Sequence, residues 1–103
     1  MNERLMNKLV AYNISKGYGI TEQDIIETVT EANRIWEHKV DTRRYYEEYE
    51  YVVDIEGVLV MYDGYNITGD SSMSDMGLSY DINTFCEVEK KEKVSFVYLP
   101  IKD

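Results

Sequence analysis

The chain is poor in the residues that build zinc sites and disulfides. Its 103 residues include one proline, one cysteine and one histidine. Because Cys86 has no second cysteine to pair with, an internal disulfide is excluded, and a zinc site of the usual ligand count or a Cys–His catalytic pair is poorly supplied. These shortages weigh against an enzyme without excluding one. We expect a non-catalytic protein with no metal or other cofactor.

Long apolar runs and positive charge are also scarce. The N-terminal segment MNERLMNKLV lacks the apolar run of a signal peptide or a membrane helix. The chain has 11 Lys and Arg against 20 Asp and Glu, so its formal net charge is −9. This charge disfavours direct binding to nucleic acid or to an anionic membrane. We expect a cytoplasmic protein whose charged partner is basic, and the sequence leaves the oligomeric state open.

Two helices are predicted in the N-terminal third of a single domain that spans residues 1–103. Apolar residues at spacings of three to five predict the first helix over residues 2–15. The segment TEQD at residues 21–24 resembles a capping box and predicts the start of the second helix. A helical stripe would carry that helix to about residues 38–41. The stripe is formed by Ile25, Val29, Ala32 and Trp36.

From residue 45 onward the apolar period changes to two, which is typical of strands. Glu56-Gly57 and Asp63-Gly64 have the composition of two-residue hairpin turns, so they predict a three-stranded meander. The residue pairs nearest these turns are Ile55 with Val58 and Tyr62 with Tyr65.

A loop and a second hairpin are predicted in the remainder of the chain. Residues 68–77, TGDSSMSDMG, have the composition of a loop. Apolar residues alternate over residues 78–88 and again over 94–98, on either side of a charged turn at 89–93. The predicted fold class is α+β, with two N-terminal helices packed on one face of an antiparallel sheet of about five strands.

The most informative feature is an acidic stretch from Tyr45 to Glu89 that contains no lysine or arginine. An even spread of the basic residues would place about five of them there. The acids of the stretch are Glu47, Glu48, Glu50, Asp54, Glu56, Asp63, Asp70, Asp75, Asp81, Glu87 and Glu89. This segregation of charge predicts a surface with a negative field.

The strand register gives part of this surface a position. It predicts an outer sheet face on which acids surround Val52, Leu59 and Met61, an arrangement typical of protein interfaces. The competing interpretation is an ordinary solvated face whose charges prevent edge pairing. The candidate partner-binding residues are Glu47, Glu48, Glu50, Asp54, Glu56, Asp63, Asp70, Asp75, Tyr46 and Met61.

Compactness, acidity and ten tyrosines give the chain a resemblance to small anti-CRISPR inhibitors and other DNA-mimic proteins of phages and mobile elements. The resemblance rests on size and composition. It implies that carboxylates take the place of DNA phosphates in the basic channel or PAM-reading site of a CRISPR effector nuclease. The residues that would do so are Glu47, Glu48, Glu50, Asp54, Glu56 and Asp63.

Two alternatives stay open at this point. An immunity or antitoxin-like protein that neutralises a basic toxin nuclease would need the same negative field. A small ligand-binding domain or enzyme could instead use a pocket between the helices and the sheet, with tyrosines as proton donors.

Overall fold

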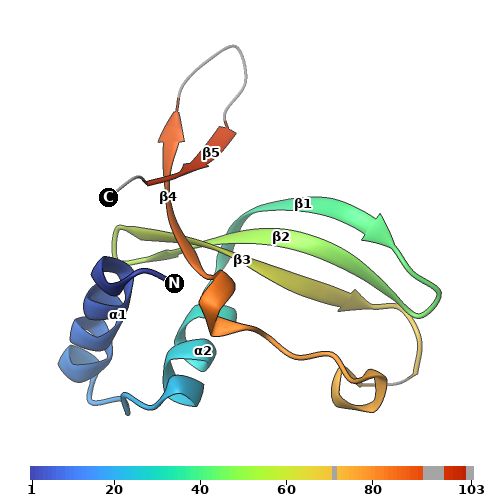
Figure 1. Ribbon diagram of the computed structural model, residues 1–103, viewed down its shortest axis with the longest axis horizontal. Helices are drawn as coiled ribbons and strands as arrows, with labels where there is room; N and C mark the ends of the chain where they lie inside the picture. Colours follow the sequence, from blue (N-terminus) through green and yellow to red (C-terminus); the bar gives the residue numbers. More distant parts are fainter. Residues whose placement is uncertain (71, 92–96, 102–103) are drawn as a thin grey trace.

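In a computed structural model, which describes residues 1–70, 72–91 and 97–101, two N-terminal helices precede a curled antiparallel sheet of five strands that forms a half-barrel (Figure 1). The predicted α+β class is therefore confirmed. The elements are α1 (Glu3–Lys16), α2 (Glu22–Thr30), β1 (Arg34–Thr42), β2 (Tyr46–Ile55), β3 (Val58–Ile67), η1 (Ser74–Met76), η2 (Ile82–Thr84), β4 (Cys86–Lys91) and β5 (Val97–Pro100). The strand order is β1-β2-β3-β4-β5.

Helix α1 has clear signals at both ends. The Asn2 side chain accepts a hydrogen bond from the Leu5 amide at 2.8 Å, which satisfies one of the free donors of the first turn. The helix ends at Gly17, whose φ of 74° is left-handed and whose amide donates back into the last turn. Leu5 and Leu9 are fully buried against the sheet.

Helix α2 starts where the sequence predicts, because both hydrogen bonds of the Thr21–Asp24 capping box are present. The helix ends earlier than predicted, at Thr30, and the next segment forms strand β1. The helical stripe is wrong at Trp36, which pairs with Val52 of β2. Two register shifts, around residues 35 and 40, interrupt the alternation of β1. Because of these β-bulges, the apolar residues of β1 do not alternate with a period of two in the sequence.

The first predicted hairpin is confirmed. Glu56 and Gly57 both have positive φ, 49° and 92°, as a type I′ turn requires. The observed register pairs Ile55 with Val58, Val53 with Val60 and Val52 with Met61.

The second predicted turn is wrong, because Asp63 and Gly64 lie inside strand β3. A glycine is required at position 64 because the Tyr51 ring leaves no space for a side chain there, and not because the chain turns. A Cβ atom at this position would lie 2.5 Å from a ring carbon of Tyr51. The aromatic ring therefore lies over the glycine, and the strand continues to Ile67. The predicted pairing of Tyr62 with Tyr65 does not form, since both residues lie in β3.

The second hairpin is confirmed in part. Strand β4 pairs with β5, from Val88 with Pro100 to Lys91 with Val97, and Figure 1 shows this hairpin projecting from the rest of the sheet. Residues 78–85 are not strand, because Asp81 caps the single turn η2 instead. Residues 68–70 and 72–77 form the predicted loop, with η1 inside it. Val94 and Phe96, which were expected in the last strand, lie outside the described residues.

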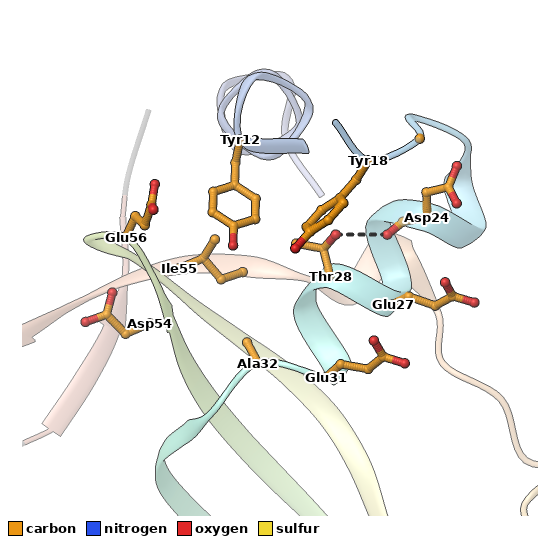
Figure 2. Close-up of a pocket in the computed structure, with 11 residues that line it drawn as sticks. Tyr12, Tyr18, Asp24, Glu27, Thr28, Glu31, Ala32, Asp54, Ile55 and Glu56 are labelled. Atoms are coloured by element: carbon orange, nitrogen blue, oxygen red, sulfur yellow. Dashed lines mark hydrogen bonds between the residues drawn. The ribbon is translucent and has the colours of Figure 1, made fainter. Parts of the chain in front are cut away.

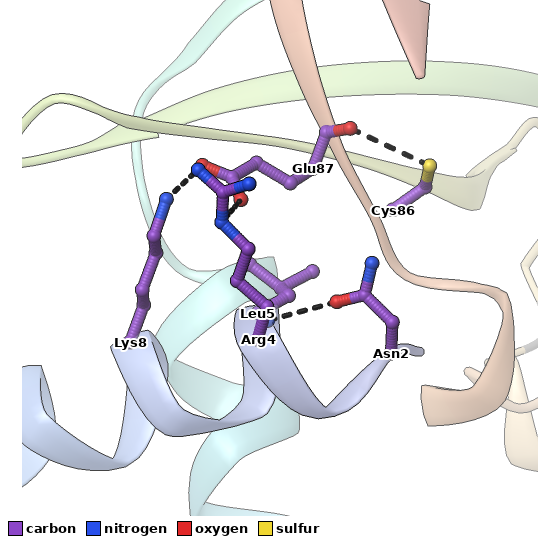
Figure 3. A network of polar contacts seen from close by, with 6 residues as sticks. All are labelled: Asn2, Arg4, Leu5, Lys8, Cys86 and Glu87. Carbon is purple, nitrogen blue, oxygen red and sulfur yellow. Dashed lines mark hydrogen bonds and ion pairs between the residues drawn. The ribbon is translucent and has the colours of Figure 1, made fainter. Parts of the chain in front are cut away.

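The hydrophobic core lies between the two helices and the inner sheet face, where it includes Tyr51, Val60 and Phe85. One carboxylate is buried beside it. Glu87 of β4 is 6% exposed, and its side chain lies 2.6 Å from the Lys8 ammonium and 4.0 Å from Arg4 (Figure 3). This network attaches α1 to β4. Among the described residues, no helix has the length and apolar character needed to cross a membrane.

Candidate functional site

Three of the predicted site residues on β2 already have basic side chains as neighbours within the chain. Strand β1 and the turn after it lie beside β2 and carry the basic residues that the sequence places outside the acidic stretch. The pairs are Lys39 with Glu47 at 3.1 Å, His38 with Glu50 at 3.1 Å and Arg43 with Glu48 at 3.7 Å. Segregation along the sequence is therefore partly cancelled in the fold. Asn66 also donates a hydrogen bond to Glu47. This hydrogen bond, followed by the one from Lys39, lowers the pKa of the Glu47 carboxyl.

The apolar centre of the predicted outer face is not an exposed patch. Val52 is 0% exposed, while Leu59 and Met61 are half-buried. The sheet curls so far that the ring of Trp36 on β1 packs 5.4 Å from the ring of Tyr98 on β5. This curl makes the face smaller than a flat meander would. The expectation of acids around an open apolar centre is wrong for Val52.

Asp63 marks a small acidic depression on the sheet. A cavity of about 230 Å³ lies here, where Gly64 contributes no side chain. Its lining residues are Val40, Glu48, Tyr49, Glu50, Asp63, Gly64 and Tyr65. Burial raises the pKa of Asp63, and the neighbouring carboxylates of Glu50 and Glu48 raise it further. Three of the predicted residues are thus brought together here.

The larger acidic feature is a groove between α1, α2 and the turn from β2 to β3. It has a volume of about 520 Å³ and is open to solvent. Figure 2 shows Tyr12 and Tyr18 beside the groove, Glu27 and Glu31 on the α2 side, and Asp54 and Glu56 on the turn side. Its lining residues are Tyr12, Tyr18, Gly19, Asp24, Glu27, Thr28, Glu31, Ala32, Asp54, Ile55 and Glu56. We call this feature the acidic groove.

Some carboxylates of the acidic groove also have local structural roles. Asp24 belongs to the capping box, and its hydrogen bonds with Thr21 lower its pKa. Asp54 accepts a hydrogen bond from the Gly57 amide at 2.7 Å, which fixes the turn. Gln23 donates to Glu27 at 3.3 Å. The groove walls therefore carry negative charge on well-ordered backbone.

One cation of the chain itself, the Lys16 ammonium, binds two residues of this groove. The Lys16 ammonium lies 2.8 Å from a carboxylate oxygen of Glu56 and 5.7 Å from the centroid of the Tyr12 ring. Both partners line the acidic groove. The hydrogen bond with Glu56, and then its charge, raise the pKa of Lys16. A carboxylate and an aromatic ring thus hold one ammonium group at the rim of the groove.

The remaining predicted residues lie away from both hollows. Tyr46 packs edge-to-face on Tyr65 at 5.7 Å. Asp75 closes its own loop, because it accepts from the Ser72 amide at 3.2 Å. Asp70 is exposed in the same loop. In the described parts of the chain, no three His, Cys, Asp or Glu side chains are placed to hold a metal ion.

Sequence reasoning missed the helical wall of the acidic groove. Asp24, Glu27 and Glu31 precede the acidic stretch, so a count confined to residues 45–89 leaves them out. Their spacing of three and four residues is the available signal, since it places them on one face of a helix. Tyr12 and Tyr18 carry no comparable signal.

No protein-family model matches the sequence, and no curated protein or solved structure gives a significant match. The chain's function is therefore inferred from its own residues.

Proposed function

We propose that this chain is a non-catalytic binding protein that inhibits a basic nucleic-acid-binding protein by engaging its arginine and lysine side chains. The acidic groove is the proposed centre of contact, and the carboxylates around Asp63 form a second acidic area. The partner class follows from charge. A protein with a net charge of −9 attracts basic surfaces, and nucleic-acid-binding proteins present such surfaces in grooves and channels.

The observation that carries the proposal is the position of Lys16. Its ammonium is held by Glu56 and by the ring of Tyr12 at the rim of the acidic groove. A basic side chain from a partner would bind Glu27 and Glu31 across the groove, and would displace Lys16 to reach Glu56 and Tyr12. Arginine suits such a site well, because its planar guanidinium binds carboxylates and stacks on aromatic rings.

Competition with DNA is the direct test of the proposed partner class. The protein, immobilised on a resin, is incubated with a bacterial lysate, and duplex DNA is then added to release what has bound. We expect basic nucleic-acid-binding proteins, nucleases among them, to be released by DNA because both ligands use the same basic surface. Partners that stay bound in saturating DNA, or that are not basic, would contradict the proposal.

The acidic groove is tested with two double variants that remove the same charge. Glu27→Gln with Glu31→Gln neutralises the helical wall, whereas Glu3→Gln with Glu22→Gln neutralises exposed acids outside the groove. We expect the first pair to weaken binding to the captured partner by about tenfold or more and the second pair to change it by much less. Equal effects would mean that only net charge matters.

The area around Asp63 is tested separately by changing Glu48, Glu50 and Asp63 together to alanine. A loss smaller than that of the groove variant is expected, because Glu48 and Glu50 already pair with Arg43 and His38. Both effects should shrink as salt rises, since exposed charges are screened over about 10 Å at 0.1 M salt. Salt-independent binding would point to an apolar interface.

A further inference from the structure

Strand β1 is an edge strand with an unusual degree of exposure. Among the described residues it pairs with β2 alone, and eight of its nine residues are exposed. The exposed residues include Ile35, at 47%, and Val40, at 55%. The strand contains no proline or glycine. An edge of this kind presents a row of backbone donors and acceptors to any other strand.

The sequence of β1 is complementary to itself when it is reversed. The extra residues of the bulges are Ile35, three positions before the central His38, and Val40, two positions after it. The other residues alternate between the faces of the sheet. Glu37 and Lys39, next to the central His38, have register partners Tyr51 and Tyr49 and so share one face. Opposite charges therefore flank the centre of the strand.

We propose that two copies of this chain associate through antiparallel pairing of their β1 strands about a two-fold axis at His38. In this register Glu37 of each copy lies opposite Lys39 of the other, which gives two cross-strand ion pairs. Such cross-strand pairs are the units that stabilise antiparallel sheets.

The face pattern agrees with this symmetry. A two-fold axis perpendicular to a sheet keeps each side chain on its own face, so paired positions must share a face. Trp36 and Asp41 have partners Val52 and Glu48 on β2 and lie on the face of His38. Arg34 and Thr42 have partners Val53 and Glu47 on the opposite face. Trp36 therefore pairs with Asp41, and Arg34 with Thr42, without a conflict of faces.

The existing contacts of Lys39 do not prevent the new pair. Its ammonium lies 3.1 Å from Glu47 and is half exposed, and an ammonium group has three hydrogen-bond donors. No ion pair within the described residues engages Glu37, which is exposed. The dimer would form one sheet of ten strands across both copies. No residue of β1 lines the acidic groove, and Val40 alone of this strand lines the cavity at Asp63. The inference goes beyond the proposed function, because association of two copies does not require a basic partner.

Charge reversal on this strand gives a sharp test. Glu37→Lys would face Lys39 of the other copy, and Lys39→Glu would face Glu37, so each variant alone introduces two repulsive pairs. Their mixture restores two attractive pairs, because one copy then carries two lysines and the other two glutamates. Sedimentation equilibrium would be measured from low to high micromolar concentration for the wild type, each variant and the mixture. Circular dichroism would verify that each variant is folded.

We expect a concentration-dependent wild-type dimer, a dissociation constant raised about tenfold or more in each single variant, and a heterodimer in the mixture. Backbone amides of β1 should also exchange with solvent more slowly at high protein concentration than at low concentration. A wild type that remains a monomer at every concentration would overturn the proposal. So would a dimer that both variants leave intact, or a mixture that remains as monomeric as its components.

Discussion

The guanidinium carbon of Arg34 lies 3.6 Å from the centroid of the Tyr51 ring, and its Nε atom donates to the Tyr62 hydroxyl at 3.3 Å. Arg34 is the first residue of β1, and the two tyrosines belong to β2 and β3. One side chain therefore joins three strands on the helix-covered face of the sheet. This contact keeps the start of β1 attached to the core, although most of the strand is exposed.

Replacing Arg34 with alanine should lower the free energy of unfolding by about 1–2 kcal/mol, because a cation–π contact and a hydrogen bond are both lost. Arg34→Lys should recover only part of this loss, since an ammonium lacks the planar face that stacks on Tyr51. Urea denaturation measures both. Arg44→Ala is the control, because Arg44 lies over the exposed Tyr45 ring at 5.0 Å. An equal loss in the control would refute the specific role of Arg34.

A methyl group at Gly64 should be poorly tolerated. The added Cβ would lie 2.5 Å from the Tyr51 ring, so Gly64→Ala should cost about 1–3 kcal/mol, the usual range for overpacking. Gly69→Ala is the matched control, because its nearest neighbour would be Tyr45 at 3.4 Å. Thermal unfolding of both variants provides the comparison. A Gly64→Ala protein as stable as the control would mean that the Tyr51 ring can move aside at little cost.

Glu87 should be the most sensitive carboxylate for stability. Glu87→Ala would leave the Lys8 ammonium without its partner at 2.6 Å, and we expect a loss of about 2 kcal/mol. This is less than for a fully buried pair because Lys8 is partly exposed. Among the residues that the structure describes, Glu89→Ala on the same strand breaks only an exposed pair with Lys91, so it should cost no more than about 0.5 kcal/mol. Chemical denaturation that ranks the two variants in the opposite order would contradict this assignment.

The raised pKa of Asp63 predicts a pH-dependent effect. In the folded state the pKa of this carboxyl lies above its ordinary value of 3.8, because folding removes part of its hydration and places it close to Glu50 and Glu48. The folded chain therefore holds more protons than the unfolded chain between 3.8 and the raised pKa, so this group's contribution to stability falls as pH rises through that window.

Asp63→Asn removes the ionised form and should stabilise the protein at neutral pH, by on the order of 0.5 kcal/mol for a surface site. The advantage should decrease as the pH falls below the raised pKa. Thermal unfolding of both proteins across acidic and neutral pH gives the readout. An advantage that grows on acidification would show that the carboxylate is stabilising. Glu47 is the internal contrast, since its lowered pKa gives it the opposite sign.

The sequence predicts elements well where local signals and tertiary structure agree. The Thr21–Asp24 capping box and the Glu56-Gly57 turn each carry their own hydrogen-bonding or φ requirement, and both are present as predicted. Strand β1 lacks such a signal, because bulges at residues 35 and 40 interrupt its alternation and Trp36 continues a helical stripe by coincidence. Gly64 resembles a turn glycine in sequence, yet a ring from the neighbouring strand determines its role.

The candidate site was predictable only in part for the same reason. Asp54 and Glu56 lie in the acidic groove, but the opposite wall comes from α2, which no argument about a continuous acidic stretch could include. Conversely, Glu47, Glu48 and Glu50 have no basic neighbours in the acidic stretch, because their partners Lys39, Arg43 and His38 precede residue 45. Pairing of β1 with β2 brings these charges together.

The network at Glu87 also constrains the order in which this protein can fold during synthesis. Lys8 binds Glu87, 79 positions later in the chain, and the ammonium group of Met1 donates to the Asn83 carbonyl, 82 positions away. Because α1 is synthesised before β4, its final docking requires a residue that is added 79 positions after Lys8. A nascent chain therefore exposes the apolar face of α1, with Leu5 and Leu9, until β4 has been synthesised. Contacts between such distant residues slow folding and lengthen exposure to chaperones or to aggregation.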